Sequence, residues 1–430
     1  MSDGKRQQPR RRTRWYLFLT VLFLLGLWVG RSLNKRAGPT EPGQEPSQTV
    51  PAEPAPSQSV EPAPSQSVEP APSQSEEPTP SQPEETPSAR AAELLEGMTL
   101  REKVCQMFVV FPEALTGEED VTQAGEAMRL ALEEYPVGGL LYDTGNMVSR
   151  DQVRELLETT RSYSGVPPIL TCDEEGGRVA RLMSTVGTTK LGPMLGYAHL
   201  GPDAAKANAR TIAQDMASCG FNTDLAPVAD VWSNPENTVI GDRAYSQDFA
   251  QAAGLIPAAV EGFHEGGVAC ALKHFPGHGD TAEDSHSGAA YVSKPLGQLR
   301  QEELLPFRAG IEAGADMVML GHLTVQDLDS EPAPFSYRIV TELLRDELGF
   351  GGVVITDSLE MEAVTGRYTS AEAAVKAVQA GVDLLLCPED LEEAVNALLD
   401  AVERDEITQA RIDESVLRIL TLKEQRGILQ

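Results

Sequence analysis

Residues 273–286 (KHFPGHGDTAEDSH) concentrate groups that can do acid, base or nucleophilic chemistry: three of the six histidines of the chain, a lysine and three acids. The preceding apolar run, 267–272, has the length and the small and branched residues of a buried strand. We therefore predict a strand that ends at Lys273 and His274 and opens into a glycine-rich loop. Loops of this kind carry the catalytic residues of α/β enzymes. An ordinary polar surface loop is the alternative.

Short apolar runs alternate with helical patterns from about residue 90 onward. This alternation, with strands apolar on both faces, is typical of a parallel sheet covered by helices. The sequence predicts an α/β fold, a (β/α)8 barrel of the TIM type that forms a single catalytic domain. A doubly wound open sheet is the alternative. The predicted strands are 106–111, 138–142, 169–172, 223–226, 268–272, 317–320, 352–356 and 382–386, and the main predicted helices are 150–161, 202–218, 246–265, 300–314, 339–348 and 371–380.

Charged or ionisable residues repeatedly follow these strands. The carboxyl ends of barrel strands meet at one face, which is where such barrels place their active sites. We therefore expect these side chains to gather there, although Asp224 and Asp230 could instead be loop caps. In chain order the strand-end residues are Asp173, Glu174, Glu175, Asp224, Asp230, Lys273, His274, His322 and Asp357.

The stretch 273–281, followed by Asp284-Ser285-His286, resembles the signature of glycoside hydrolase family 3, in its β-N-acetylglucosaminidase (β-N-acetylhexosaminidase) branch. The resemblance covers roughly residues 90–430. It implies a retaining enzyme that hydrolyses terminal non-reducing N-acetylglucosamine from peptidoglycan-derived or related glycans. The resemblance also implies that one barrel can suffice. Enzymes of this branch carry the acid/base on a loop of the barrel, whereas the β-glucosidase branch draws it from a second domain.

Retaining glycoside hydrolysis needs a carboxylate nucleophile and a proton donor. Residues 352–361 resemble the nucleophile motif of the family, which implies that Asp357 forms a covalent glycosyl-enzyme. His286 and Asp284 resemble the His–Asp acid/base dyad of this branch. A neighbouring carboxylate orients an imidazole and favours its protonated form. If His286 were not the acid, Glu174 and Glu175 would be the next candidates.

Other stretches resemble sugar-binding elements of the family. Residues 171–181 match its Asp-x-Glu-Gly-Gly-Arg-Val-x-Arg motif, and residues 241–245 resemble its Gly-x-Arg-Ser-Phe element with Ala-Tyr in place of Ser-Phe. Ser358 stands where some relatives have a second acid. These departures leave the fine substrate preference open. The substrate-binding residues that the resemblance implies are Asp173, Arg181, Arg243, Lys273 and His274.

The N-terminal part predicts a membrane anchor. Residues 1–14 form a basic tail with six basic side chains and one acid, and residues 15–30 are an uncharged apolar run with aromatic residues at both ends. The excess of positive charge before this run places the tail in the cytoplasm and the catalytic domain outside the cell. We therefore expect a single-pass protein of the cell membrane. A cleaved signal peptide and a secreted protein are the alternative.

A Pro-, Ser- and Glu-rich linker is predicted over residues 37–89, where an eight-residue repeat begins at Glu53, Glu61 and Glu69. Such a segment cannot bury a core and is expected to be disordered and extended. The first 36 residues carry a net charge of +8 and the linker −9, which leaves −29 for residues 90–430. An acidic domain of this kind argues against a nucleic-acid partner. The expected partners are a glycan and the membrane.

Several alternatives stay open from the sequence. A β-glucosidase, a xylosidase or a phosphorolytic enzyme of the same family is possible, as is a wall-binding barrel without activity. A metal-dependent hydrolase would bind its metal through a cluster of histidines and acids. In this alternative the metal ligands would be His274, His278, His286, Asp280 and Asp284. We expect neither a metal nor another cofactor. The five cysteines are expected to be buried free thiols: Cys105, Cys172, Cys219, Cys270 and Cys387.

Overall fold

The computed structural model describes residues 89–281, 288 and 290–429. The expected basic tail (1–14), apolar anchor (15–30) and linker lie outside the described residues, as do Asp284 and His286. Helix α2 begins at Ala89, beside the boundary expected between linker and catalytic domain. Among the helices of the described part, none combines the length and the apolar character that crossing a membrane requires.

Eight parallel strands form a barrel, as the sequence predicts, and they follow one another around it in chain order. The first and last strands, β1 and β12, pair with each other. The ring closes between β11 and β12 through a bridge between Ile355 and Leu384, where the Thr356 N–H donates to the Leu384 carbonyl at 3.0 Å. The doubly wound alternative is therefore wrong. The barrel strands are β1 (Phe108–Val110), β2 (Gly139–Leu141), β3 (Ile169–Cys172), β6 (Thr223–Asp224), β7 (Ala269–Phe275), β9 (Met317–Leu320), β11 (Val353–Thr356) and β12 (Leu385–Leu386).

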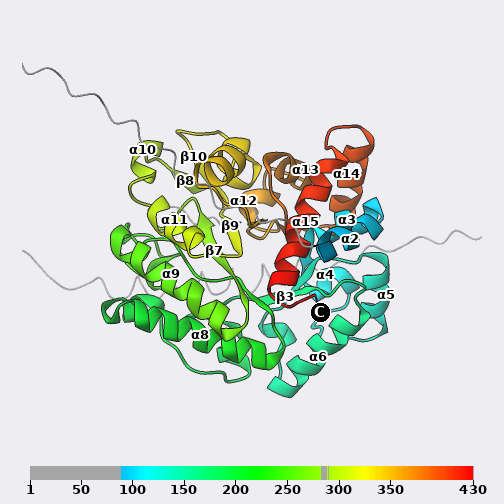
Figure 1. Ribbon diagram of the computed structural model, residues 1–430, viewed down its shortest axis with the longest axis horizontal. Helices are drawn as coiled ribbons and strands as arrows, with labels where there is room; N and C mark the ends of the chain where they lie inside the picture. Colours follow the sequence, from blue (N-terminus) through cyan, green and yellow to red (C-terminus); the bar gives the residue numbers. More distant parts are fainter. Residues whose placement is uncertain (1–88, 282–287, 289, 430) are drawn as a thin grey trace, which may run out of the picture. The chain divides into compact units, whose positions relative to one another are not determined.

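Helices surround the strands, and Figure 1 shows α8 beside α9 and the last helix, α15, beside α2 and α3. The α-helices are α2 (Ala89–Gly97), α3 (Leu100–Gln106), α4 (Pro112–Thr116), α5 (Glu126–Glu134), α6 (Arg150–Tyr163), α7 (Arg181–Thr185), α8 (Pro202–Cys219), α9 (Phe249–Gly266), α10 (Leu296–Leu299), α11 (Leu304–Glu312), α12 (Glu362–Thr365), α13 (Ser370–Ala380), α14 (Leu391–Glu403) and α15 (Gln409–Gln425). A π-helix, η5 (Arg338–Glu347), replaces the α-helix expected there, and 3-10 turns are η1 (Thr144–Asn146), η2 (Met194–Leu200), η3 (Gly241–Arg243) and η4 (Ala333–Phe335).

Six of the eight strands differ from the predicted bounds by one to three residues at one or both ends, and two of these differences are informative. Gln106 belongs to α3, because a capping box between Thr99 and Glu102 starts a helix that continues through the beginning of the expected first strand. Strand β7 continues to Phe275, so Lys273 and His274 lie within it and not after it. Hydrogen bonds to two neighbouring segments of the chain explain the extension. The Lys273 carbonyl accepts from the Ala229 N–H at 2.7 Å, and the Phe275 carbonyl accepts from the Gly321 N–H at 3.0 Å.

Two small sheets follow barrel strands. The antiparallel pair β4 (Glu174–Gly176) and β5 (Val179–Ala180) comes directly after β3, and its turn uses Gly176 and Gly177 at φ of +86° and +61°. The parallel pair β8 (Ala290–Val292) and β10 (Leu323–Val325) brings the chain beyond residue 289 next to the segment after β9.

All five cysteines are buried free thiols, which confirms that expectation.

Helix α15 carries a fully buried lysine. Lys423 lies in the core, where its Nζ donates to Oε1 of Gln106 at 2.8 Å. Gln106 in turn donates through Nε2 to the Pro136 carbonyl at 2.7 Å. Burial lowers the pKa of Lys423 to about 7, because the interior disfavours the charged ammonium. This lysine therefore links the stability of the fold to pH.

We predict that Lys423→Met removes a pH-dependent part of the stability. Between about pH 7 and the unfolded pKa of about 10.5, the folded state holds fewer protons at this site than the unfolded chain. Wild-type stability should therefore rise with pH in this window, by up to about 1.4 kcal/mol per pH unit from this one group, and fall as pH drops towards 7. Urea unfolding from about pH 7 to about pH 9 measures the slope.

The control is Lys206→Met, which removes a lysine of α8 that is paired with Glu261 and Glu265 at the surface. This variant should keep the wild-type slope. A constant difference between wild type and Lys423→Met across the whole window would show that Lys423 does not titrate there.

Candidate active site

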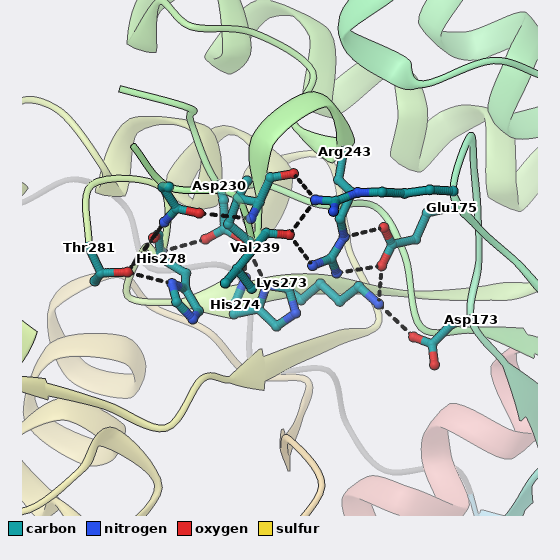
Figure 2. A network of polar contacts seen from close by, with 12 residues as sticks. Asp173, Glu175, Asp230, Val239, Arg243, Lys273, His274, His278 and Thr281 are labelled. Carbon is teal, nitrogen blue, oxygen red and sulfur yellow. Dashed lines mark hydrogen bonds and ion pairs between the residues drawn. The ribbon is translucent and has the colours of Figure 1, made fainter. Parts of the chain in front are cut away.

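A group of four charged side chains, of which Lys273 and Glu175 are almost fully buried, connects three segments at the carboxyl end of the barrel (Figure 2). Lys273 of β7 donates to Asp173 Oδ1 and contacts Glu175 Oε1, each at 2.6 Å from Nζ. Glu175 also accepts two hydrogen bonds of 2.8 Å from Nε and Nη2 of Arg243, in η3. The sequence predicted Asp173, Arg243 and Lys273 as neighbours, and the structure brings them together. From the sequence, Glu175 was not identified as the residue that connects them.

Glu175 is ionised in this setting. Its side chain is 3% exposed, as is that of Lys273. Burial alone would raise the pKa of Glu175, but the charges of Lys273 and Arg243 and their hydrogen bonds outweigh it and hold the pKa well below its usual range. A carboxylate that two cations keep ionised cannot serve as a proton donor. This removes one of the two reserve candidates for the acid.

Arg181 lies between two carboxylates at the start of α7. Its Nε is 3.1 Å from Asp143 Oδ1, and its Nη2 is 3.9 Å from Asp173 Oδ2. Glu174 accepts from the backbone N–H groups of Leu182 and Met183, at 2.7 and 3.0 Å, and so fixes the first turn of this helix. Burial raises the pKa of Glu174 to about 7 against these hydrogen bonds. The sequence missed Asp143, which follows β2.

Another arginine, Arg178, holds the segment that precedes Arg243. Its Nη2 donates to the carbonyls of residues 238, 239 and 240, at distances of 2.8, 2.6 and 3.0 Å. Arg243 adds a hydrogen bond of 3.1 Å from Nη1 to the Val239 carbonyl. The conformation of this loop, and with it the position of the Arg243 guanidinium, therefore depends on Arg178. Arg178 belongs to the motif 171–181 that resembles the family, but no role is predicted for it from the sequence.

Asp230 orients His274 (Figure 2). Its Oδ2 accepts from the His274 backbone N–H at 3.0 Å and lies 2.7 Å from Nδ1 of the ring, and its Oδ1 accepts from the His278 N–H at 2.6 Å. Burial would raise the pKa of Asp230, but His274 and His278 outweigh it and lower the pKa. Asp230 is thus a buried structural anion. His278 shares a hydrogen bond of 2.8 Å between Nδ1 and the Thr281 hydroxyl.

Asp357 follows β11 and carries an ionised carboxylate. Its backbone N–H donates to the Leu320 carbonyl at 2.9 Å, and its Oδ1 accepts from the Ser358 N–H at 2.8 Å. Burial would raise the pKa of Asp357, but the charges of His274 and His322, the Ser358 N–H and Lys273 outweigh it and lower the pKa. The half-buried Asp357 is therefore an ionised carboxylate that interacts electrostatically with His274 and Lys273.

His322 and Asp224 have structural surroundings. His322 Nε2 donates to the Ser358 carbonyl at 2.8 Å, next to Asp357. Asp224 is fully buried, and its Oδ1 accepts from the Glu174 N–H at 3.1 Å. Burial raises the pKa of Asp224 well above its usual value, because the interior favours the neutral form of the acid. The structure supports the cap-like interpretation for Asp224. Asp284 and His286 lie outside the described residues, so their pairing stays a prediction.

The metal alternative required His274, His278 and Asp280 to share an ion with residues that are not described. In the described part of the chain, Asp230 and Thr281 engage the two rings, and Asp280 accepts from Ser233. The group there whose ligand atoms lie within 4.8 Å of one another is a different one, made by His264, Cys270 and Asp316. Arg426, at the C-terminal end of α15, forms an ion pair with Asp316, so this group also anchors the C-terminal helix.

We predict that Asp230→Asn destabilises the fold by about 2–4 kcal/mol, because an amide NH₂ would face a donor in place of one carboxylate oxygen. Asp224→Asn is the matched control, since Asp224 is equally buried, has a raised pKa in place of a lowered one and accepts one hydrogen bond from the Glu174 N–H. It should cost less than about 1 kcal/mol. Urea unfolding at neutral pH compares the two. Equal costs would contradict the ionised state assigned to Asp230.

The chain matches the family model described as the glycosyl hydrolase family 3 N-terminal domain over residues 99–422. It is 39% identical over 277 residues to a β-hexosaminidase of Xanthomonas euvesicatoria pv. vesicatoria, covering 62% of this chain and 81% of that protein. It is 34% identical over 322 residues to β-hexosaminidase A of Pseudoalteromonas piscicida, covering 68% of this chain and 54% of the relative.

A solved structure of a glycoside hydrolase family 3 β-N-acetylglucosaminidase from Paenibacillus sp. str. FPU-7 superposes with a TM-score of 0.72 at 38% identity. The superposition covers 77% of this chain and 63% of that one. This chain thus spans less than two thirds of the Paenibacillus protein, and only 54% of the Pseudoalteromonas protein. The chain therefore belongs to glycosyl hydrolase family 3, a family of glycoside hydrolases, and within it to the β-N-acetylglucosaminidase branch.

Proposed function

We propose that this protein is a retaining β-N-acetylhexosaminidase that hydrolyses terminal non-reducing N-acetylglucosamine from glycans. The observation that carries the proposal is the ionised carboxylate of Asp357 at the carboxyl end of β11, beside the group formed by Asp173, Glu175, Arg243 and Lys273. A carboxylate nucleophile beside a rigid set of charged hydrogen-bonding groups is what retaining hydrolysis of a sugar requires. The names of the relatives from Xanthomonas and Paenibacillus agree with this activity.

In the first step, Asp357 attacks the anomeric carbon and forms a glycosyl ester while the bond to the leaving oxygen breaks. His286 protonates that oxygen, and Asp284 orients the imidazole and favours its charged form. In the second step, the neutral His286 takes a proton from water. The water oxygen attacks the same carbon and releases Asp357 as a carboxylate. Two inversions give net retention.

Sugar hydroxyls would be held by Asp173, Arg181, Arg243, Lys273 and His274. Their mutual ion pairs support this role, because the charged groups are oriented before a substrate arrives and hydrogen bonds to charged groups are the stronger kind. The bond from Asp230 to Nδ1 leaves Nε2 of His274 as the ring atom for a substrate contact. Glu175 compensates the charge of the two cations that flank it.

The natural substrate is proposed to be a peptidoglycan-derived muropeptide or a related saccharide outside the cell. The support comes from the chain order: a basic tail and an apolar segment at residues 15–30, followed by a linker rich in proline and glutamate. Such an arrangement would anchor the catalytic domain in the membrane and extend it into the wall. Detection of the intact protein in the membrane fraction, with the domain accessible to added protease, tests this location.

A substrate panel tests the activity. We expect hydrolysis of an aryl N-acetyl-β-D-glucosaminide and of chitobiose, with much slower reaction of the aryl β-glucoside and aryl β-xyloside. The rates are measured with and without phosphate, and the first-formed sugar anomer is followed by NMR. Free β-N-acetylglucosamine as the first product supports the proposal. A sugar phosphate formed in place of free sugar, or a preference for glucoside, would contradict it.

We predict that His286→Ala affects substrates according to how badly their leaving group needs a proton. The kcat/KM on chitobiose should fall by about 10²–10⁴-fold, the usual contribution of general acid catalysis. The kcat/KM on a dinitrophenyl N-acetylglucosaminide should fall far less, because that phenol leaves as its own anion. The parameter kcat/KM is used because it reports the glycosylation step.

Asp357→Asn is the control, since the nucleophile is needed whatever the leaving group. It should abolish most turnover on both substrates while the melting temperature stays near that of the wild type, because only one carboxylate oxygen is replaced. Equal losses for His286→Ala on both substrates, together with a lower melting temperature, would show a structural role for His286.

A further inference from the structure

A row of four side chains with alternating charge leads from the buried part of the candidate site to the surface. Lys273, which is 3% exposed, donates to Asp173 at 2.6 Å (Figure 2). Asp173 is 24% exposed, and its Oδ2 lies 3.9 Å from Nη2 of Arg181, which is 33% exposed. Oδ1 of Asp143, which is 47% exposed, lies 3.1 Å from Nε of Arg181. Exposure thus rises along the row, and Arg181 and Asp143 form its solvent-facing end.

The guanidinium of Arg181 is held at one nitrogen and open at the others. Asp143 forms its ion pair with Nε, whereas a guanidinium carries most of its N–H donors on the terminal nitrogens. Within residues 89–281, 288 and 290–429, neither terminal nitrogen of Arg181 donates a hydrogen bond, and the 3.9 Å to Asp173 is too long for one. The ion pair with Asp143 therefore orients the guanidinium and leaves its terminal N–H groups for a ligand.

Asp143 is itself fixed by the segment that it begins. Its Oδ1 accepts from the Thr144 N–H at 2.7 Å, and its own N–H donates to Oδ1 of Asn146 at 2.9 Å. Asn146 is buried and donates through Nδ2 to Oε1 of Glu113 at 2.6 Å. The carboxylate is therefore oriented by the fold and not only by Arg181.

The backbone of Arg181 is fixed independently of Asp143. Glu174 accepts from the Leu182 and Met183 N–H groups and so holds the first turn of α7, which Arg181 begins. What remains to be oriented is the long side chain, which loses much rotamer freedom when it is ordered. Orienting it before a ligand binds removes this cost from the binding step.

We propose that Asp143 is a positioning residue for sugar binding by Arg181, in addition to the residues that the family resemblance implies. The inference rests on the proposed function, since it takes Arg181 to bind hydroxyls of the terminal N-acetylglucosamine. A contact with that sugar is present before and during the reaction, so its loss raises KM and leaves kcat unchanged. The loss is also the same whatever the leaving group.

The test is Asp143→Ser in the full chain. Serine keeps an oxygen that can accept from the Thr144 N–H, but it is shorter and uncharged and cannot pair with Arg181. The inhibition constant of free N-acetylglucosamine should rise about two- to fivefold, the range that a partly exposed ion pair can account for. The kcat/KM on chitobiose and on the dinitrophenyl glycoside should fall by this same factor, with kcat near the wild-type value. Asp143→Asn keeps the acceptor oxygen without the charge and should restore part of the loss.

Glu347→Gln is the matched control. Glu347 is 33% exposed and pairs at 2.6 Å with Arg300, which is 43% exposed, so this variant weakens a similar ion pair elsewhere in the fold. It should keep the wild-type inhibition constant and both kcat/KM values. An unchanged inhibition constant in Asp143→Ser, or a loss confined to chitobiose, would overturn the proposal.

The double variant Arg181→Ala/Asp143→Ser separates positioning from an effect of Asp143 on its own. If Asp143 acts through Arg181, its substitution should not raise the inhibition constant further once Arg181 is absent. Independent, additive losses would overturn the positioning role while the function stands. If Arg181→Ala alone leaves the inhibition constant unchanged, the binding role of Arg181 fails and the inference with it, whereas the activity on the substrate panel is judged separately.

Discussion

The ionised carboxylate of Glu175, buried between Lys273 and Arg243, is the interaction on which the geometry of the site depends. It joins the hairpin after β3, the end of β7 and the η3 segment through hydrogen bonds and ion pairs of 2.6–2.8 Å. Removing one partner of such a buried pair leaves an uncompensated charge and costs several kcal/mol. The three segments are therefore fixed relative to one another, and the side chains proposed to bind sugar hydroxyls are oriented in advance.

In the signature stretch 273–281, four positions have an identifiable physical role. Lys273 forms the ion pairs, and His274 is oriented by Asp230. Gly277 makes room for Glu303, and Gly279 makes room for the Val231 carbonyl. The loop is thus a tightly packed connection from β7 to the residues that follow, and its glycines are required by close approach rather than by flexibility.

Much of the fold could be predicted from the sequence, because apolar strands and helical periods repeat along the chain. All eight strands were found, while the end of β7 was placed at Leu272 although pairing with the Ala229 and Gly321 segments extends it to Phe275. Such pairing depends on contacts that no local pattern reveals. The same limit hid Asp143 altogether. Glu175 and Asp230 were expected at the carboxyl face of the barrel, but not the contacts they make, since Glu175 binds Arg243, which is 68 positions away in the sequence. The resemblance identified Asp173, Arg243 and Lys273 because it carries such long-range information.

The electrostatics of the described carboxyl groups indicate where the acid can come from. Enzymes separate the roles of their carboxyl groups through environments that move the pKa values apart. Asp357, Glu175 and Asp230 all have a lowered pKa and are ionised. Asp224 and Glu174 have a raised pKa. However, Asp224 is fully buried, and both oxygens of Glu174 accept hydrogen bonds from the first turn of α7. Of these five groups, the two with a raised pKa are engaged by the protein itself, and Asp357, the proposed nucleophile, is ionised. The proposal of a proton donor at His286 is compatible with this distribution of charge among the five groups.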